Sequence, residues 1–117
     1  MALKSPKAKG SRLERKVAGL IRSKCGIEAY RTPLSGAFWN MKGDITSPKL
    51  PFAIECKNSE RFNLWKYWEQ TTEQATYKKP LLVHSANHRP IMATLLFEDL
   101  LDLIKENMEL WDDRTDA

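Results

Sequence analysis

One short segment near the middle of the chain, residues 52–57, reads as an apolar β-strand with two charged residues set into it: Phe-Ala-Ile-Glu-Cys-Lys. Side chains alternate between the two faces of a strand, so Glu55 and Lys57 should share one face. Asp44 comes eleven residues before Glu55, and a turn that contains two prolines separates them. We expect Asp44 to lie on a neighbouring strand, beside the other two. The sequence therefore predicts a compact cluster of two carboxylates and one ammonium group.

Such a cluster has an obvious chemical use. Carboxylates supply oxygen ligands for a hard cation, and an ammonium group beside them can hold an attacking water. These are the groups that metal-assisted hydrolysis of a phosphodiester requires. The alternative is a salt-bridged strand, because glutamate and lysine are common on the solvent face of a half-buried sheet. Two features favour the first interpretation: Gly43 precedes Asp44, and the strand is otherwise wholly apolar.

The chain has 117 residues, which is the length of one domain with its own core. We expect a basic, flexible arm at 1–10, a single folded domain at 11–110 and an acidic tail at 111–117. The opening residues are lysine-rich and no apolar run approaches a membrane span, so neither a signal peptide nor a transmembrane helix is predicted. Cys25 and Cys56 make no disulfide framework, and Cys56 should be a buried, reduced thiol of a cytoplasmic protein.

Basic and acidic residues gather at opposite ends of the chain. Before Gly26 there are eight basic residues and one acid, Glu14, whereas acids dominate after Phe97. A basic first quarter is typical of proteins that bind a polyanion such as nucleic acid. A solvated, lysine-rich start explains the same pattern equally well.

Apolar periodicity and turn residues predict eight secondary-structure elements. Helices are expected at 11–25, 64–77 and 98–110, and strands at 28–32, 44–46, 52–57, 81–85 and 91–96. Ser11 should cap the first helix, with Glu14 in the capping-box position, and Asn63 should cap the second. The order α-β-β-β-α-β-β-α indicates an α/β fold in which helices flank a mixed sheet.

Glu14 is oddly placed on the first predicted helix. It lies within the apolar arc, where an unpaired carboxylate is costly to bury. It could point at the cluster of Asp44 and Glu55, or it could satisfy the backbone at Ser11 as a cap.

Further polar residues allow two interpretations each. Gln70 and Gln74 lie four apart on one flank of the second helix, where they could steady the lysine or a phosphate, or simply be surface residues. Ser35 follows Arg31 in a loop that could contact backbone phosphates, or could be an ordinary turn.

Together these motifs resemble the PD-(D/E)xK nuclease superfamily. They are, in chain order, a helix with Glu14, Ser-Gly at 35–36, Gly-Asp-Ile at 43–45, Ile-Glu-Cys-Lys at 54–57 and Trp-x-x-Trp-Glu-Gln at 65–70. Within the superfamily the chain is most similar to archaeal- and phage-type Holliday junction resolvases and to related small phage endonucleases, over about residues 9–101. The superfamily often has proline before the aspartate, and Gly43 is a frequent variant of it.

The resemblance implies a restriction-endonuclease-like mixed sheet flanked by helices, and a Mg²⁺-dependent endonuclease in which Mn²⁺ can substitute. The implied metal ligands are Asp44, Glu55, the backbone carbonyl of Cys56, and Glu14. Lys57 would orient or help to deprotonate the attacking water. Gln70 would be the helix glutamine of the family, with Gln74 as the second choice, and Ser35 would match its loop serine.

The same resemblance implies DNA as the partner, branched in the resolvases, which serve recombination and repair in the cytosol of a bacterium or phage-infected host. A four-way junction has two-fold symmetry, so a symmetric homodimer is expected. The expected contacts to the DNA backbone are Lys7, Lys9, Arg12, Arg15, Lys16, Arg31 and Ser35. The alternatives are a phage nicking or homing-type endonuclease, an endonuclease for flaps or single strands, and a catalytically silent nucleic-acid-binding module.

Overall fold

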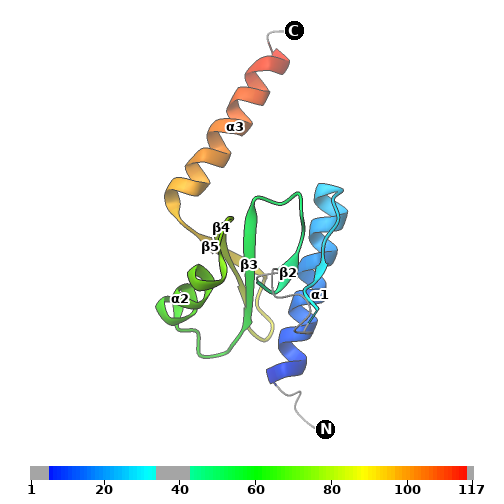
Figure 1. The fold of residues 1–117 in the computed structure, drawn as a ribbon, viewed down its shortest axis with the longest axis vertical. Helices are drawn as coiled ribbons and strands as arrows, with labels where there is room; N and C mark the ends of the chain where they lie inside the picture. The colour runs from blue at the N-terminus through cyan, green and yellow to red at the C-terminus, as the bar shows by residue number, and fades with distance from the viewer. Residues whose placement is uncertain (1–5, 34–42, 116–117) are drawn as a thin grey trace.

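The structure, a computed structural model, describes residues 6–33 and 43–115 (Figure 1). Its elements follow the predicted order α-β-β-β-α-β-β-α, which confirms the α/β fold. The helices are α1 (Pro6–Cys25), α2 (Leu64–Gln74) and α3 (Phe97–Thr115). The strands are β1 (Tyr30–Arg31), β2 (Ile45–Thr46), β3 (Phe52–Asn58), β4 (Lys79–Ser85) and β5 (Met92–Leu95).

The five strands form one mixed sheet in the order β1-β2-β3-β4-β5. Only β3 and β4 run parallel, in a register from Phe52 opposite Lys79 to Asn58 opposite Ser85. The other neighbours are antiparallel. Helix α2 makes the connection between β3 and β4, because parallel strands need a crossover rather than a tight turn.

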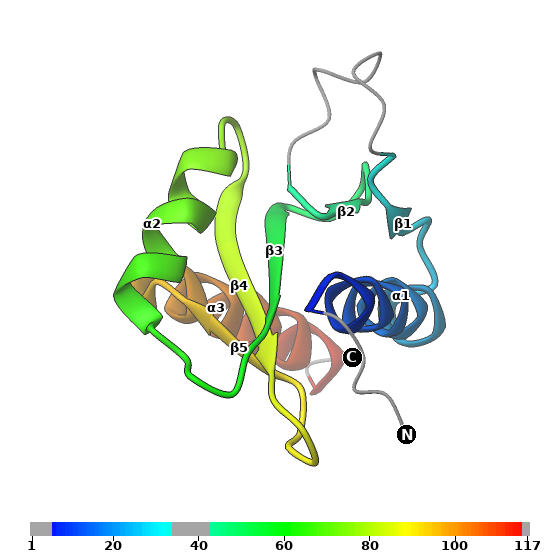
Figure 2. The ribbon, with the colours of Figure 1, turned by 90° about the horizontal axis from the view of Figure 1, so that it is seen from below.

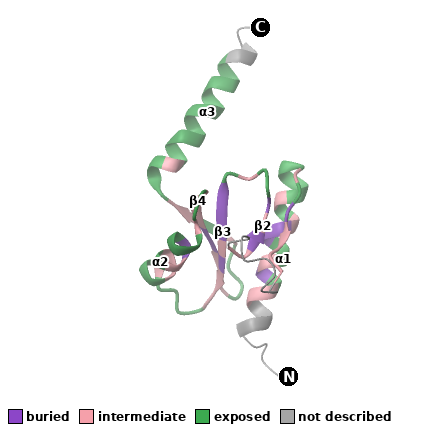
Figure 3. Ribbon diagram, viewed as in Figure 1, coloured by how far each residue is buried: buried purple, intermediate pink, exposed green. Residues whose placement is uncertain are grey.

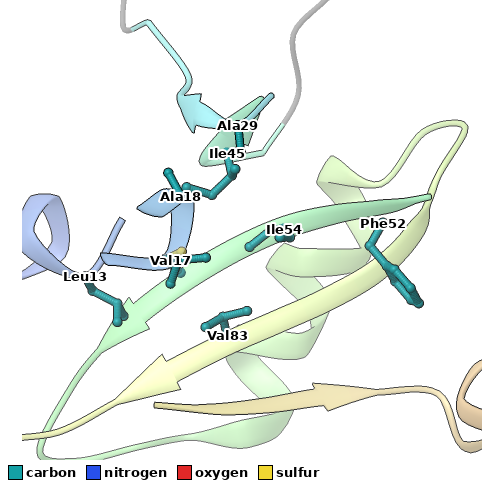
Figure 4. Packing of buried hydrophobic residues seen from close by; sticks show 9 residues of the cluster. Leu13, Val17, Ala18, Ala29, Ile45, Phe52, Ile54 and Val83 are labelled. Atoms are coloured by element: carbon teal, nitrogen blue, oxygen red, sulfur yellow. The ribbon is translucent and has the colours of Figure 1, made fainter. Parts of the chain in front are cut away.

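Helices α1 and α2 lie on opposite sides of β3 (Figure 2). Towards α1, Ile54, Cys56 and Val83 pack with Leu13 and Val17 of the helix, and all five are buried (Figure 4). The burial of Cys56 confirms the side predicted from strand alternation. Glu55 and Lys57, of opposite parity, therefore belong to the side that α2 covers.

The α2 side of the sheet has a small core of its own. Leu82 and Thr71 are both fully buried there, and Leu82 lies opposite Glu55 in the register of β3 and β4. The central strands are accordingly the most buried part of the molecule (Figure 3). The predicted cap of α2 is confirmed, because the Asn63 side chain accepts a hydrogen bond from the Lys66 N–H at 3.2 Å.

Three helix boundaries differ from the sequence prediction by three or more residues, and one of them is the end of α2, which lies at Gln74 rather than at residue 77. The cap predicted at Ser11 is wrong, because α1 already begins at Pro6 and Ser11 lies inside it. Proline suits a first helical turn, where its missing N–H has no partner to lose, and the lysines and alanine that follow favour a helix. Helix α3 continues to Thr115, through the segment predicted as an acidic tail. None of the described helices combines the length and apolar character needed to cross a membrane.

Candidate active site

Asp44 is fixed to the strand that carries the other charged residues. Its N–H donates to the Ile54 carbonyl at 2.8 Å, and its Oδ2 accepts the Cys56 N–H at 2.8 Å. The residue before it makes this approach possible. Gly43 has φ +83°, and a Cβ on it would stand 2.8 Å from the Ile54 carbonyl oxygen. Glycine is therefore required here, because any other residue would push Asp44 away from β3.

Asp44 and Glu55 share one small acidic site. The pKa of Glu55 rises from its ordinary value of 4.5 to about 8, first because burial disfavours the carboxylate and next because the Asp44 charge and a hydrogen bond to Asp44 favour the protonated form. Lys57 acts in the opposite direction, and Glu14 adds to the rise. All four residues therefore interact in one region of the fold.

Lys57 and Glu14 enter this region from different sides. The Lys57 ammonium lies 5.3 Å from the centre of the Tyr67 ring of α2, a cation–π contact on the edge of the site. Glu14 comes from α1, and its Oε2 lies 2.8 Å from Nε of Arg31. The Cys56 thiol between them has a raised pKa, chiefly from burial and then from Asp44, Glu14 and Glu55.

Glu14, which lies on the apolar face of α1, forms an ion pair with Arg31. Arg31 also donates through an Nη atom to the Ser11 hydroxyl at 3.1 Å. Glu14 is therefore neutralised by a side chain seventeen residues away rather than by a capping box. Arg31 is held by protein groups in this structure, so its proposed contact to DNA would require an exchange of partners.

The two candidate glutamines of α2 have different surroundings. The Gln70 Oε1 atom is buried without a hydrogen-bond partner among the described residues. A buried amide oxygen left in this state is costly, so a further donor is expected at this position. Gln74 is exposed and lines a cavity of about 170 Å³ that contains neither Asp44 nor Glu55. Of the two glutamines, Gln70 is thus the one whose buried amide oxygen lacks a hydrogen bond among the described residues.

The donor set suits Mg²⁺. Among residues 6–33 and 43–115 there is no group of three or more histidine, cysteine, aspartate or glutamate side chains that could hold a metal ion. Mg²⁺ does not need such a cage, because it keeps several waters and commonly takes one or two carboxylates together with substrate phosphates. Asp44 and Glu55 are two crowded carboxylates whose repulsion a divalent cation would relieve. The residues therefore fit this ion.

A basic groove adjoins α1. It is a cavity of about 390 Å³ in which Arg12 and Lys16 of α1 face His88 and Arg89 of the turn between β4 and β5. His88 has φ +59°, a backbone conformation unusual for a residue other than glycine. The sequence had shown 86–90 only as a hairpin turn. Its adjacent histidine and arginine were the available signal, but only the fold brings them to α1.

Several other residues that were predicted to contact DNA are not assigned to this groove. Ser35 lies outside the described residues, as do the side chains of Lys7 and Lys9. Arg15 is exposed on α1 and does not line the groove.

A mixed sheet whose central strand carries Glu55 and Lys57, with Asp44 hydrogen-bonded beside them and a helix on each side, defines a class of nuclease folds. The model of one family, described as "Phage putative PDDEXK endonuclease", matches residues 5–114 of this chain. The chain belongs to that family and is a nuclease of the PD-(D/E)xK superfamily. Comparisons with curated proteins and with solved structures give no significant match.

Proposed function

We propose that this nuclease is a Mg²⁺-dependent endodeoxyribonuclease that hydrolyses phosphodiesters at the site of Asp44, Glu55 and Lys57. The observation that carries the proposal is the placement of Asp44, whose Oδ2 accepts the Cys56 N–H at 2.8 Å, beside the half-buried Glu55, whose pKa is raised by burial and by Asp44. A purely structural site would favour pairing these acids with bases, because like charges in a half-buried site are destabilising. A divalent cation bound by Asp44 and Glu55 would offset the repulsion between the two carboxylates.

Each residue of the chain then has a definite task. Asp44, held by the Cys56 N–H, and Glu55 would hold the ion, with Glu14 and the Cys56 carbonyl as further candidates. When bound, Mg²⁺ would supply positive charge to the phosphate and lower the pKa of a bound water. The Lys57 ammonium would orient the attacking water and offset the negative charge that develops on the phosphate.

Gln70 would act as a positioning residue in the same site. Its unpartnered amide oxygen can accept a hydrogen bond from the Lys57 ammonium or from the attacking water. Either contact would satisfy the buried atom and fix the direction of the proton donor.

The basic groove would hold the DNA backbone at α1, and its lining residue nearest to the acidic site in sequence is Asn58, next to Lys57. Arg12, Lys16 and Arg89 converge on one cavity, and guanidinium groups bind phosphate oxygens in a bidentate manner. Each phosphate contact contributes to the dependence of affinity on salt. Arg89→Gln should therefore weaken binding to all sequences alike and make the salt dependence less steep, which a fluorescence-anisotropy titration at several salt concentrations measures. An unchanged slope would remove the groove from the interface.

The finer specificity we propose is that of a Holliday junction resolvase acting as a homodimer in recombination or repair. A two-fold junction favours a two-fold enzyme, and two symmetric incisions call for two copies of the site that Asp44, Glu55 and Lys57 form. The competing substrates are nicked or linear duplex, flaps and single strands. Cleavage rates on a matched panel of these DNAs separate them, and a preference for linear duplex over junctions would reject the resolvase assignment.

The catalytic proposal itself is tested by one pair of variants. Lys57→Ala should lower the cleavage rate about a hundredfold to a thousandfold, because it removes one preorganised charge from the transition state. Lys66→Ala is the matched control, since Lys66 is exposed on α2. Cleavage should also stop in EDTA and return with Mg²⁺ or Mn²⁺. Full activity of Lys57→Ala, or cleavage that survives EDTA, would overturn the proposal, and the second outcome would favour a metal-independent mechanism.

A further inference from the structure

Helix α3 exposes a large apolar surface. The exposed apolar side chains, each between 37% and 70% exposed, are Leu96 just before the helix and, within it, Phe97, Leu100, Leu101, Leu103, Ile104, Met108, Leu110 and Trp111. All residues from Leu100 to Asp112 are exposed, whereas Asp99 in the first turn is partly buried. A helix that packs on its own domain has its apolar side covered, whereas beyond the first turn of α3 the apolar and the acidic residues are exposed alike.

The apolar residues of α3 follow the spacing of a helix-pairing seam. Phe97, Leu101, Ile104, Met108 and Trp111 succeed one another at intervals of four, three, four and three residues. That spacing is the seam of a coiled coil, in which side chains of one helix fill gaps on another. Acids at positions 99, 102, 106 and 109 lie on the side of the helix opposite the seam, whereas Glu98 and Asp112 flank it.

The body of the protein leaves this seam uncovered. Lys79 at the start of β4 forms ion pairs with Asp99 at 3.8 Å and Asp102 at 3.4 Å, which hold the acidic side of α3 to the sheet. The helix then extends away from the sheet (Figure 1). In the described part of the chain, α1 and α2 turn their buried side chains towards the sheet, so neither has a free seam to offer.

We propose that α3 is a dimerisation helix, and that its seam pairs with the α3 seam of a second copy of this chain. The area suits such a pair. The five seam side chains, 44% to 70% exposed, present on the order of 500 Å² per chain, which is the size of a weak, reversible interface of below about 1,200 Å² in total. The second copy brings a seam of the same length and spacing, which makes the contact self-complementary. No position of the seam itself carries a charge, so two seams can meet without burying one.

This interface deepens the proposed function, because it supplies the surface through which a resolvase-like homodimer would form. It does not depend on catalysis. A protein that cuts no DNA would still pair through α3, and a monomer could still cut DNA.

The test measures mass in solution for three proteins. The wild-type chain should sediment at twice the 13.5 kDa of one chain in the micromolar range, by analytical ultracentrifugation. Ile104→Glu places a charge in the middle of the seam and should give a monomer. Lys105→Gln is the matched control, because it changes the net charge by the same amount at the neighbouring polar position, and it should remain a dimer. Ile104 is 44% exposed, so its substitution takes nothing from the core.

Hydrogen exchange gives a second, independent measurement. Amides of residues 97–115 should exchange fast in dilute protein and become protected as concentration rises, and this protection should be absent in Ile104→Glu. A wild-type monomer, a dimer that survives Ile104→Glu, or protection that does not change with concentration would each overturn the proposal. A monomer with protected α3 would mean that the helix folds back on its own sheet. DNA cleavage by Ile104→Glu on linear substrates reports separately on the catalytic site.

Discussion

Replacing Glu55 by glutamine should stabilise the metal-free protein at neutral pH. Glutamine has the same shape and its amide can still donate to Asp44, but it carries no charge to bury beside that carboxylate. In the wild type, burial and Asp44 raise the pKa of Glu55 to about 8 from 4.5. Between these two values the folded protein holds a proton that the unfolded chain has lost, so stability falls as pH rises through this window.

The size of the effect follows from the same two values. The two pKa values correspond to about 3 kcal/mol at pH 7, and solvent screening of the partly buried carboxyl lowers this cost to about 2 kcal/mol. Glu55→Gln should recover about 2 kcal/mol, because glutamine needs no proton to be neutral. For a chain of this length, that is a rise in Tm of about 10 °C.

Thermal unfolding followed by circular dichroism, from pH 5 to 8.5 in EDTA, measures this directly. The two proteins should be similar near pH 5 and diverge as pH rises. Excess Mg²⁺ should raise the Tm of the wild type at pH 7 and leave that of Glu55→Gln nearly unchanged. Glu69→Gln, an exposed glutamate of α2, is the control and should behave as the wild type. A variant that is less stable than the wild type at pH 8 in EDTA would refute the reasoning.

Three further outcomes are expected. Mg²⁺ affinity, measured by calorimetry, should rise by up to about tenfold per pH unit below pH 8, because binding must displace the Glu55 proton; a flat profile would contradict this. Gly43→Ala should cost roughly 2 to 4 kcal/mol in urea unfolding, because its Cβ would meet the Ile54 carbonyl at 2.8 Å with φ at +83°. Leu82→Ala should cost about 2 to 5 kcal/mol, because Leu82 is fully buried, and a smaller loss would indicate a collapsible core.

Much of the site could be predicted because its geometry is local. The alternation of residues 52–57 alone places Glu55 and Lys57 on one face of β3 and Cys56 on the other, and the structure has this arrangement. The cap at Asn63 and the order of the elements depend on neighbouring residues in the same way. A pattern of period two or 3.6 can be read without knowing the fold.

The misplaced start of α1 shows where local signals compete. Ser11 followed by Glu14 resembles a capping box, yet the helix begins at Pro6 and places both residues one turn or more inside it. Residues 6–10 favour a helix strongly enough to extend it, and Glu14 then finds Arg31 as its partner. A motif of four residues cannot decide between a cap and an ion pair, because the partner is distant in sequence.

By itself, the sequence determined the secondary structure of the central elements, the faces of β3 and the acid-acid-lysine set, because each depends on residues a few positions apart. Only the tertiary structure decided which charges meet. It brought Asp44 to the Cys56 N–H, Glu14 to Arg31, and the turn after β4 to α1. It also left the apolar side of α3 without a cover. These outcomes depend on packing between segments that are distant in the sequence. No local sequence pattern indicates which of these segments come into contact.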